Sequence, residues 1–353
     1  SIEELAERGK AGAGLTRPEL AVLLSYSKMD LYRRLIDSDV PEDPYLRGEL
    51  TRYFPAELQK HYGKLFAKHR LSREIIATAT TNSVVNRMGP SFTLRAEEDT
   101  GANIGQIARA YTIAREAFDM RDLWKQLELL GARAPAACQY EVLNESARLL
   151  RFVTYWLLHR HPDELNIDQQ VTALRPGLRA LRNSFGHLLQ GTAKESFEAA
   201  RERMRKHHLP DAIAIHFAQF EALSSGPDLV EVATESGESI DRAAAIYFHV
   251  GEALSLDWLR AQILSLRIEG RWQAIARTTL RDQLHTLQRA LCLQVLTHGA
   301  KESPTAAFAH WARKRAHAVE HVKQTINDMK SLPTADFATL SVALQSLRQV
   351  AAE

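Results

Sequence analysis

Apolar residues recur at three- and four-residue intervals along nearly all of the chain, and the alternation typical of strands is almost absent. This spacing gathers apolar side chains on one face of an α-helix. The three clearest patterns follow Trp272–Val295, Phe308–Met329 and Phe337–Leu347. Short turns containing Gly or Pro separate them, which favours antiparallel neighbours. The sequence therefore predicts an all-α fold, a multi-helix bundle or array with no significant sheet.

A helix that begins near Thr16 has the strongest start signal. Thr16 is a good N-cap, Glu19 stands three residues later as in a capping box, and Pro18 suits the first turn. Pro41 and Pro44 then end the helix, because proline disfavours helical geometry at and before its own position. The apolar stripe of this helix is expected to be buried, and it consists of Leu20, Leu23, Leu24, Leu31 and Leu35.

Similar cap and stop signals predict more helices in the first half. They are expected at 55–69, 73–88, 104–118, 120–131 and 135–159. The stretch 224–239 is rich in Ser, Gly, Glu and Pro and predicts a long surface loop. A polar, proline-containing stretch at 161–168 is the expected boundary between subdomains. The chain then divides into a linker (1–15), a helical subdomain (16–165) and a helical-bundle subdomain (166–353).

The charge balance argues against several classes of partner. The 353 residues include 45 basic and 43 acidic side chains, a net charge of +2. This balance predicts neither nucleic-acid binding nor attraction to anionic lipid. No uninterrupted apolar run approaches about 18 residues, so no membrane span is expected. Cys138 and Cys292 are too few for a disulfide framework, which favours the cytoplasm. The first residue is not Met, and we expect a fragment of a longer polypeptide.

Signals for catalysis or cofactor binding are weak. A dinucleotide site needs glycines where a strand turns into a helix. The glycine cluster Gly9, Gly12 and Gly14 has the wrong spacing and follows no strand, so it is interpreted as a flexible linker. There is no P-loop, and no nucleophile–base arrangement can be nominated. We therefore expect no catalytic and no cofactor-binding residue in this chain.

Histidines on one predicted helix have two interpretations. His317 and His321 are four residues apart, a spacing that can bind zinc, and His310 precedes them. They lack the H-E-x-x-H pattern, so a solvated basic helix face is favoured and no metal is expected.

Arginines in the first half also have two interpretations, an ion-pair network inside or between domains or a solvated face. The solvated face is favoured, because exposed pairs are common. The residues concerned are Arg87, Arg95, Arg109, Arg115 and Arg121, with Glu97, Glu98, Asp99 and Glu116 nearby. The tryptophans are expected in the core or in helix–helix contacts, and they are Trp124, Trp156, Trp258, Trp272 and Trp311.

The run Gly14–Lys28 is the first of several ordered motifs within residues 12–160. The others are Asp43-Pro44-Tyr45-Leu46, Tyr53-Phe54-Pro55, His69–Thr78, Val84–Gly89, Glu98–Ala102, Ile107–Tyr111 and Ile113–Glu116. Together they resemble one family, the large bacterial NAD-specific glutamate dehydrogenases, in their C-terminal helical region. Pro90 departs from the family pattern and puts the continuity of a helix there in doubt.

The resemblance implies that the complete polypeptide oxidatively deaminates L-glutamate to 2-oxoglutarate and ammonia, with NAD as the hydride acceptor. The family's nucleotide fold, catalytic lysine and substrate-binding residues lie upstream, so none falls on a residue of this chain. The chain is then expected to be a noncatalytic C-terminal helical domain with a structural, assembly or regulatory role. Alone, it is expected to be inactive and to hold no cofactor.

The expected partners are the catalytic domain of the same polypeptide and further copies of it in a homo-oligomer. The helix at Thr16–Lys28 directly follows the linker, so it is best placed to contact the catalytic domain. The candidate contact residues are Thr16, Arg17, Glu19, Tyr26 and Lys28. Two alternatives remain, a stand-alone helical interaction module with no enzymatic parent and an α-helical metalloenzyme that uses His317 and His321.

Overall fold

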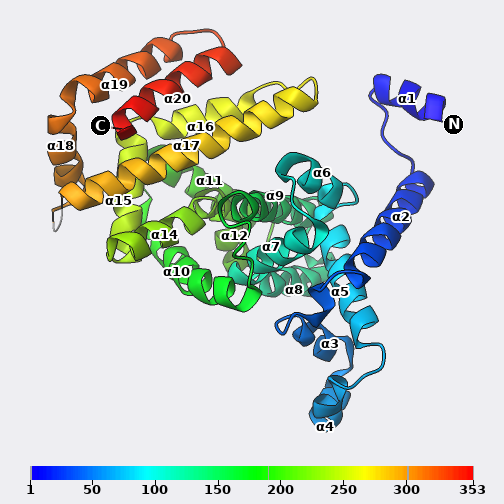
Figure 1. Cartoon of the computed structure of the whole chain (residues 1–353). Coiled ribbons are helices and arrows are strands. Elements are labelled where there is room, and N and C mark those ends of the chain that lie inside the picture. The colour runs from blue at the N-terminus through cyan, green and yellow to red at the C-terminus, as the bar shows by residue number, and fades with distance from the viewer. Residues whose placement is uncertain (1, 190, 300–301, 353) are drawn as a thin grey trace. The chain divides into compact units, whose positions relative to one another are not determined.

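The computed structural model describes residues 2–189, 191–299 and 302–352. These residues form α-helices joined by short turns and two 3-10 segments, and they contain no β-strand (Figure 1). The predicted all-α fold is confirmed. Contacts divide the chain into two compact units, residues 1–114 with 154–170 and residues 115–153 with 171–353. The division into 1–15, 16–165 and 166–353 stays a prediction.

The first unit consists of short helices around α5. Its elements are α1 (Ile2–Lys10), α2 (Arg17–Ile36), η1 (Val40–Glu42), α3 (Arg47–Tyr53), α4 (Ala56–Phe66), α5 (Ser72–Met88) and α6 (Phe92–Thr100), with most of α7 (Ile104–Ala117) and the end of α9 (Ala136–Arg160). Helices α2 and α3 pack against α5, and Leu35, Leu50 and Ile76 are almost completely buried there. Arg109 of α7 fixes the segment after α2 by an ion pair with Asp39 at 2.9 Å.

The second unit is larger, and α17 lies at the centre of its later helices, in contact with α14, α15, α16, α18 and α20. Its elements include α8 (Met120–Leu130), η2 (Gly131–Arg133), α10 (Ile167–Leu188), α11 (Gly191–Lys206), α12 (Asp211–Ala218), α13 (Phe220–Leu223), α14 (Gly226–Ser236), α15 (Ile240–Ala253), α16 (Leu256–Ser265), α17 (Arg271–His298), α18 (Pro304–Lys314), α19 (Ala316–Lys330) and α20 (Phe337–Ala352). Leu284 and Leu291 of α17 are completely buried.

The predicted helices of the first half are all present, with ends shifted by a few residues at most. The doubt about helix continuity at Pro90 was justified, because α5 ends at Met88 and α6 begins at Phe92. Gly89 between them has a φ of 89°, a left-handed conformation that glycine adopts without strain. Helices α1, α3 and α6 were not predicted.

The predicted surface loop at 224–239 is wrong, because most of it is helix α14. Pro227 occupies the first turn, where a missing backbone N–H costs nothing, and Gly237 ends the helix in a left-handed conformation. Leu229 and Val232 of this helix are fully buried. Composition alone was misleading here, since the same Gly and Pro residues mark helix ends as well as loops.

Two further expectations for the C-terminal part need correction. The pattern Phe308–Met329 is not one helix, because Arg315 leaves helical geometry and separates α18 from α19. Trp272 is 80% exposed at the start of α17 and belongs to no core, whereas Trp311 is completely buried. Within the described residues no helix is both long enough and apolar enough to cross a membrane.

Two glycines of α10 predict opposite effects of the same substitution. A Cβ on Gly177 would lie 2.7 Å from Val230 Cγ2, whereas a Cβ on Gly186 would meet nothing within 4 Å. Val230 is buried and its rotamer is restricted. We expect Gly177→Ala to lower the free energy of unfolding by about 1–2 kcal/mol, since overpacking outweighs the gain in helix propensity. Gly186→Ala should raise it by about 0.5–1 kcal/mol. Urea denaturation measures both, and equal stabilisation would contradict the close packing of α10 on α14.

Candidate functional site

The capped start of α2 is held by a cluster that includes two of the predicted contact residues. The Glu19 carboxylate accepts hydrogen bonds from the Thr16 backbone N–H at 2.7 Å and from the Thr16 hydroxyl at 2.8 Å. Arg8 of α1 donates to both oxygens of the same carboxylate, at 2.8 and 2.6 Å. The Arg8 guanidinium and the Thr16 N–H lower the pKa of Glu19 to about 2. Glu19 and Thr16 therefore fix α2 to α1.

Arg8 was not among the predicted contact residues, and the glycines beside it are not simply a flexible linker. Residues 2–10 form α1, and this helix ends in a Schellman motif in which Ala13 N–H donates to Arg8 C=O and Gly12 N–H to Gly9 C=O. Gly12 has a φ of 72°, as this motif requires. The segment interpreted as a flexible linker thus begins with a helix whose last turn presents Arg8 to Glu19.

The N-terminal half of α2 is exposed on several sides. Tyr26 is 67% exposed, and it forms one line with Val22 at 56% and Met29 at 47%. Leu20 and Leu23, on another side, are each 41% exposed. The predicted buried stripe is therefore wrong for Leu20 and Leu23 and only half right for Leu24, which is half-buried. The physical reason is that α2 packs on α5 through its C-terminal half, where Leu31 and Leu35 lie.

The other predicted contact residues lie around this apolar surface. Arg17 is exposed at the first position of α2, and Lys28 is half-buried two residues beyond Tyr26. The surface formed by Leu20, Val22, Leu23, Tyr26 and Met29 is hereafter called the α2 surface. It has apolar groups in the middle and charged groups at its ends, an arrangement typical of interaction sites.

A second cluster, in the second unit, joins acidic and basic groups that the sequence left ambiguous. Arg115 is 2% exposed and donates to Glu116 at 2.8 Å, and Arg121 donates to the same oxygen at 2.6 Å. The preferred interpretation of a solvated face is wrong for these residues. Arg109, in the first unit, also lies in a network, with Asp39 and Asp43.

Asp119 extends this cluster through partners that sequence analysis missed. Arg179 donates to its two oxygens at 2.8 and 2.7 Å, and Arg182 lies at 3.5 Å. Asp119 has a φ of 53°, a conformation that Asp tolerates better than most residues. The helical spacing of Arg175, Arg179 and Arg182 places them on one face of α10, and the sequence shows this spacing. It does not show that Asp119 is their partner.

His216 completes the cluster and is neutral. Its Nδ1 lies 3.2 Å from a nitrogen of Arg182, and since a guanidinium can only donate, Nδ1 accepts. Burial, with a smaller contribution from the Arg182 charge, lowers the pKa of His216 to about 3. The cluster holds α10 and α12 against the start of α8.

The histidines considered for a metal site lie on two different helices. His317 and His321 are exposed on α19, whereas His310 is on α18 and 3.5 Å from Glu302. In the described parts of the chain, no group of three or more His, Cys, Asp or Glu side chains is arranged to hold a metal ion.

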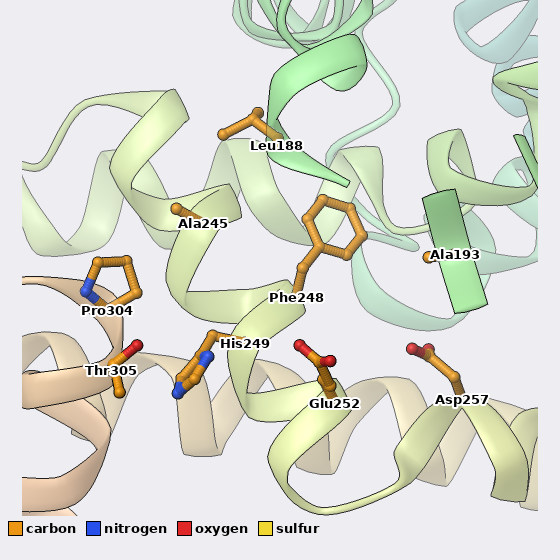
Figure 2. A pocket seen from close by; sticks show the side chains of 9 residues that line it. All are labelled: Leu188, Ala193, Ala245, Phe248, His249, Glu252, Asp257, Pro304 and Thr305. Carbon is orange, nitrogen blue, oxygen red and sulfur yellow. The ribbon is translucent and has the colours of Figure 1, made fainter. Parts of the chain in front are cut away.

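A small cavity lies in the second unit (Figure 2). Phe248, His249 and Glu252 of α15 line it, and the carboxylates of Glu252 and Asp257 lie on one side of it. Its volume is about 130 Å³, well below the roughly 300 Å³ at which ligand pockets begin. This cavity is too small for a dinucleotide.

These features define an all-α domain with a capped, largely exposed apolar helix near its N-terminus. A family model described as "Glutamate dehydrogenase, C-terminal" matches residues 12–349. The chain belongs to this glutamate dehydrogenase C-terminal family, as the sequence motifs predicted. The alternative of a module from an unrelated protein is thereby disfavoured.

Three relatives show how much of a longer protein the chain represents. It is 36% identical to the NAD-specific glutamate dehydrogenase of Pseudomonas aeruginosa over 353 residues, 99% of this chain and 22% of that protein. The proteins of the same name from Halomonas elongata and Mycobacterium tuberculosis are 34% and 27% identical, with the same two shares. The chain therefore spans about a fifth of the length of these curated relatives.

Buried His216 predicts a pH dependence of stability. Its folded pKa of about 3 lies below the usual value of about 6.5 in an unfolded chain, so the fold favours the neutral form. This contribution to stability is complete above about pH 6.5 and is lost as the pH falls toward 3, by up to about 1.4 kcal/mol per pH unit. His216→Gln keeps an acceptor for Arg182 and should make the acid slope shallower. Urea denaturation between about pH 4.5 and 7.5 tests this. An unchanged slope would mean that His216 is not held neutral.

Proposed function

We propose that the chain is a noncatalytic helical domain of an NAD-dependent glutamate dehydrogenase and that it supports the assembly of the enzyme. The complete polypeptide would convert L-glutamate, NAD and water to 2-oxoglutarate, ammonia and NADH in the cytoplasm. The names of the three relatives support the reaction and the cofactor. The chain itself would bind neither substrate nor NAD.

The α2 surface is the observation that carries the assembly role. A helix at the surface of a protein normally keeps apolar residues on one side, and a helix that is apolar all round is normally buried. The first half of α2 is apolar on several sides and yet exposed. Its exposure is explained if another part of the enzyme covers it. We propose that the catalytic domain of the same polypeptide covers it, with Arg17, Tyr26 and Lys28 among the contact residues. The complete polypeptide would then assemble as a homo-oligomer.

The anchoring and capping of α2 support this role. Leu31 and Leu35 anchor its C-terminal half in the first unit, and the Arg8–Glu19 pair together with the Thr16 cap orders its N-terminal end. The exposed turns between these anchors are therefore presented as a preformed helix. Docking of a preformed surface costs little conformational entropy, which favours a permanent contact.

An activity assay tests the proposal that this chain is noncatalytic. We expect the isolated chain, incubated with L-glutamate and NAD, to produce no NADH absorbance, because the cavity lined by Phe248, His249 and Glu252 is too small for a dinucleotide. The full-length enzyme under the same conditions should produce it. NADH formation by the isolated, purified chain would contradict the noncatalytic assignment.

A charge placed on the α2 surface should separate assembly from folding. Tyr26→Glu should leave the denaturation midpoint of the isolated chain unchanged, because the side chain is 67% exposed there. In the full-length enzyme it should destabilise the contact by about 3 kcal/mol or more, since a carboxylate would be buried without a partner. Reduced activity and a lower unfolding temperature of the full-length enzyme are the readouts.

Gln169→Glu provides the control for this substitution. It adds the same charge at an exposed position in the first turn of α10, where a carboxylate suits the helix dipole. We expect little effect in either protein. If both substitutions leave the full-length enzyme intact, the α2 surface is solvent-exposed there and the assembly role is wrong.

A further inference from the structure

A second exposed apolar surface lies on α4, at the end of the first unit beyond α3 (Figure 1). Leu58, Tyr62 and Leu65 follow one another at i, i+4 and i+7, so they share one side of the helix. They are 41%, 53% and 59% exposed. Tyr53, just before the helix, is 62% exposed. The three side chains on α4 are hereafter called the α4 stripe.

The α4 stripe has a basic flank. Residues 56–70 contain Lys60, Lys64, Lys68 and Arg70 but only one acidic residue, Glu57. Their net charge of +3 exceeds the +2 of the whole chain. Lys60 is paired with Glu57 at 3.0 Å, and Lys64, four residues later, is exposed on the same side of the helix. Lys68, in the turn after the helix, is exposed as well. An apolar centre with a one-sided basic flank is complementary to an apolar surface with acidic groups.

The attachment of α4 to the rest of the unit is thin. Of its 11 residues only Phe66 is buried, where it stacks on Phe54 with ring centroids 4.2 Å apart. One further hydrogen bond, from Gln59 Nε2 to the Phe54 carbonyl at 2.7 Å, holds its first turn. A helix of this length is marginal in water without tertiary contacts. A partner on the α4 stripe would supply the burial that the unit does not.

We propose that the α4 stripe docks on an acidic, apolar surface in the part of the polypeptide that precedes this domain. The inference rests on the proposed function, and the length of the relatives leaves about four fifths of such a polypeptide outside residues 1–353. Contact with a second copy of α4 about a two-fold axis is disfavoured, because it would bring the same lysines together. A lipid surface is disfavoured because the stripe covers only two turns of the helix, and the affinity of an interfacial helix for a membrane scales with its buried apolar area.

A cysteine in the α4 stripe tests the proposal. Both native cysteines of the chain are buried, so a thiol reagent should modify Leu65→Cys selectively, and mass spectrometry of the peptide identifies the site. In the isolated chain we expect rapid modification. In the full-length enzyme at low salt, modification should be at least about tenfold slower. The partner surface is tethered to the stripe at a roughly millimolar effective concentration, so it should cover the cysteine most of the time. High salt should restore part of the rate, since it screens the basic flank.

Charge reversal provides the matched comparison. In the full-length enzyme that carries Leu65→Cys, Lys64→Glu should restore rapid modification. Lys125→Glu, at an exposed lysine of α8, should leave the slow rate unchanged. Equal effects of the two reversals, or equal rates in the isolated chain and the full-length enzyme, would overturn the proposal.

The remaining outcomes identify other occupants. Protection in the isolated chain that grows with its concentration would assign the stripe to a second copy and overturn the proposal. Protection only in the presence of phosphatidylserine vesicles would assign it to lipid, with the same consequence. Tyr26→Cys, measured in parallel, reports on the α2 surface. If Tyr26→Cys is protected in the full-length enzyme and Leu65→Cys is not, only the α4 proposal is wrong. If neither cysteine is protected, the proposed function is wrong as well.

Discussion

The structure depends on the burial of one apolar face of each helix. A helix satisfies its backbone hydrogen bonds internally, so helices are joined to one another chiefly by side chains. In the second unit, α17 buries its apolar face against the helices that surround it, and its Leu284 and Leu291 are fully buried. In the first unit this burial is incomplete. Helices α2 and α4 leave apolar side chains exposed there, and the proposed contacts of this domain would bury them.

Charged groups set positions that apolar burial leaves free. Apolar contacts are non-directional, whereas a guanidinium that donates to both oxygens of a carboxylate fixes distance and orientation. Arg8 does this for the start of α2, and Arg179 does it for the turn before α8. Both pairs act at helix ends, where the chain changes direction. The near-neutral net charge of the protein therefore combines many paired charges with a local basic excess in residues 56–70.

The sequence was sufficient for the fold class and for most helices of the first half, because periodicity and capping are local signals. It was insufficient where the outcome depends on a distant partner. Leu20 and Leu35 belong to the same periodic pattern, yet only Leu35 is buried, since periodicity shows which side of a helix is apolar but not which element covers it. Arg179 and Asp119 are 60 residues apart and meet only in the folded chain. Gly226 and Pro227 were misread because the same residues begin helices and interrupt them.

The two cysteines give this domain a chemical property of its own. Cys292 is fully buried in α17, and burial raises its pKa far above the ordinary range of a thiol. Cys138 is also buried and free. Oxidants attack the thiolate and need access to it, so neither sulfur is a ready target. Reaction of either sulfur therefore requires the surrounding helices to open locally.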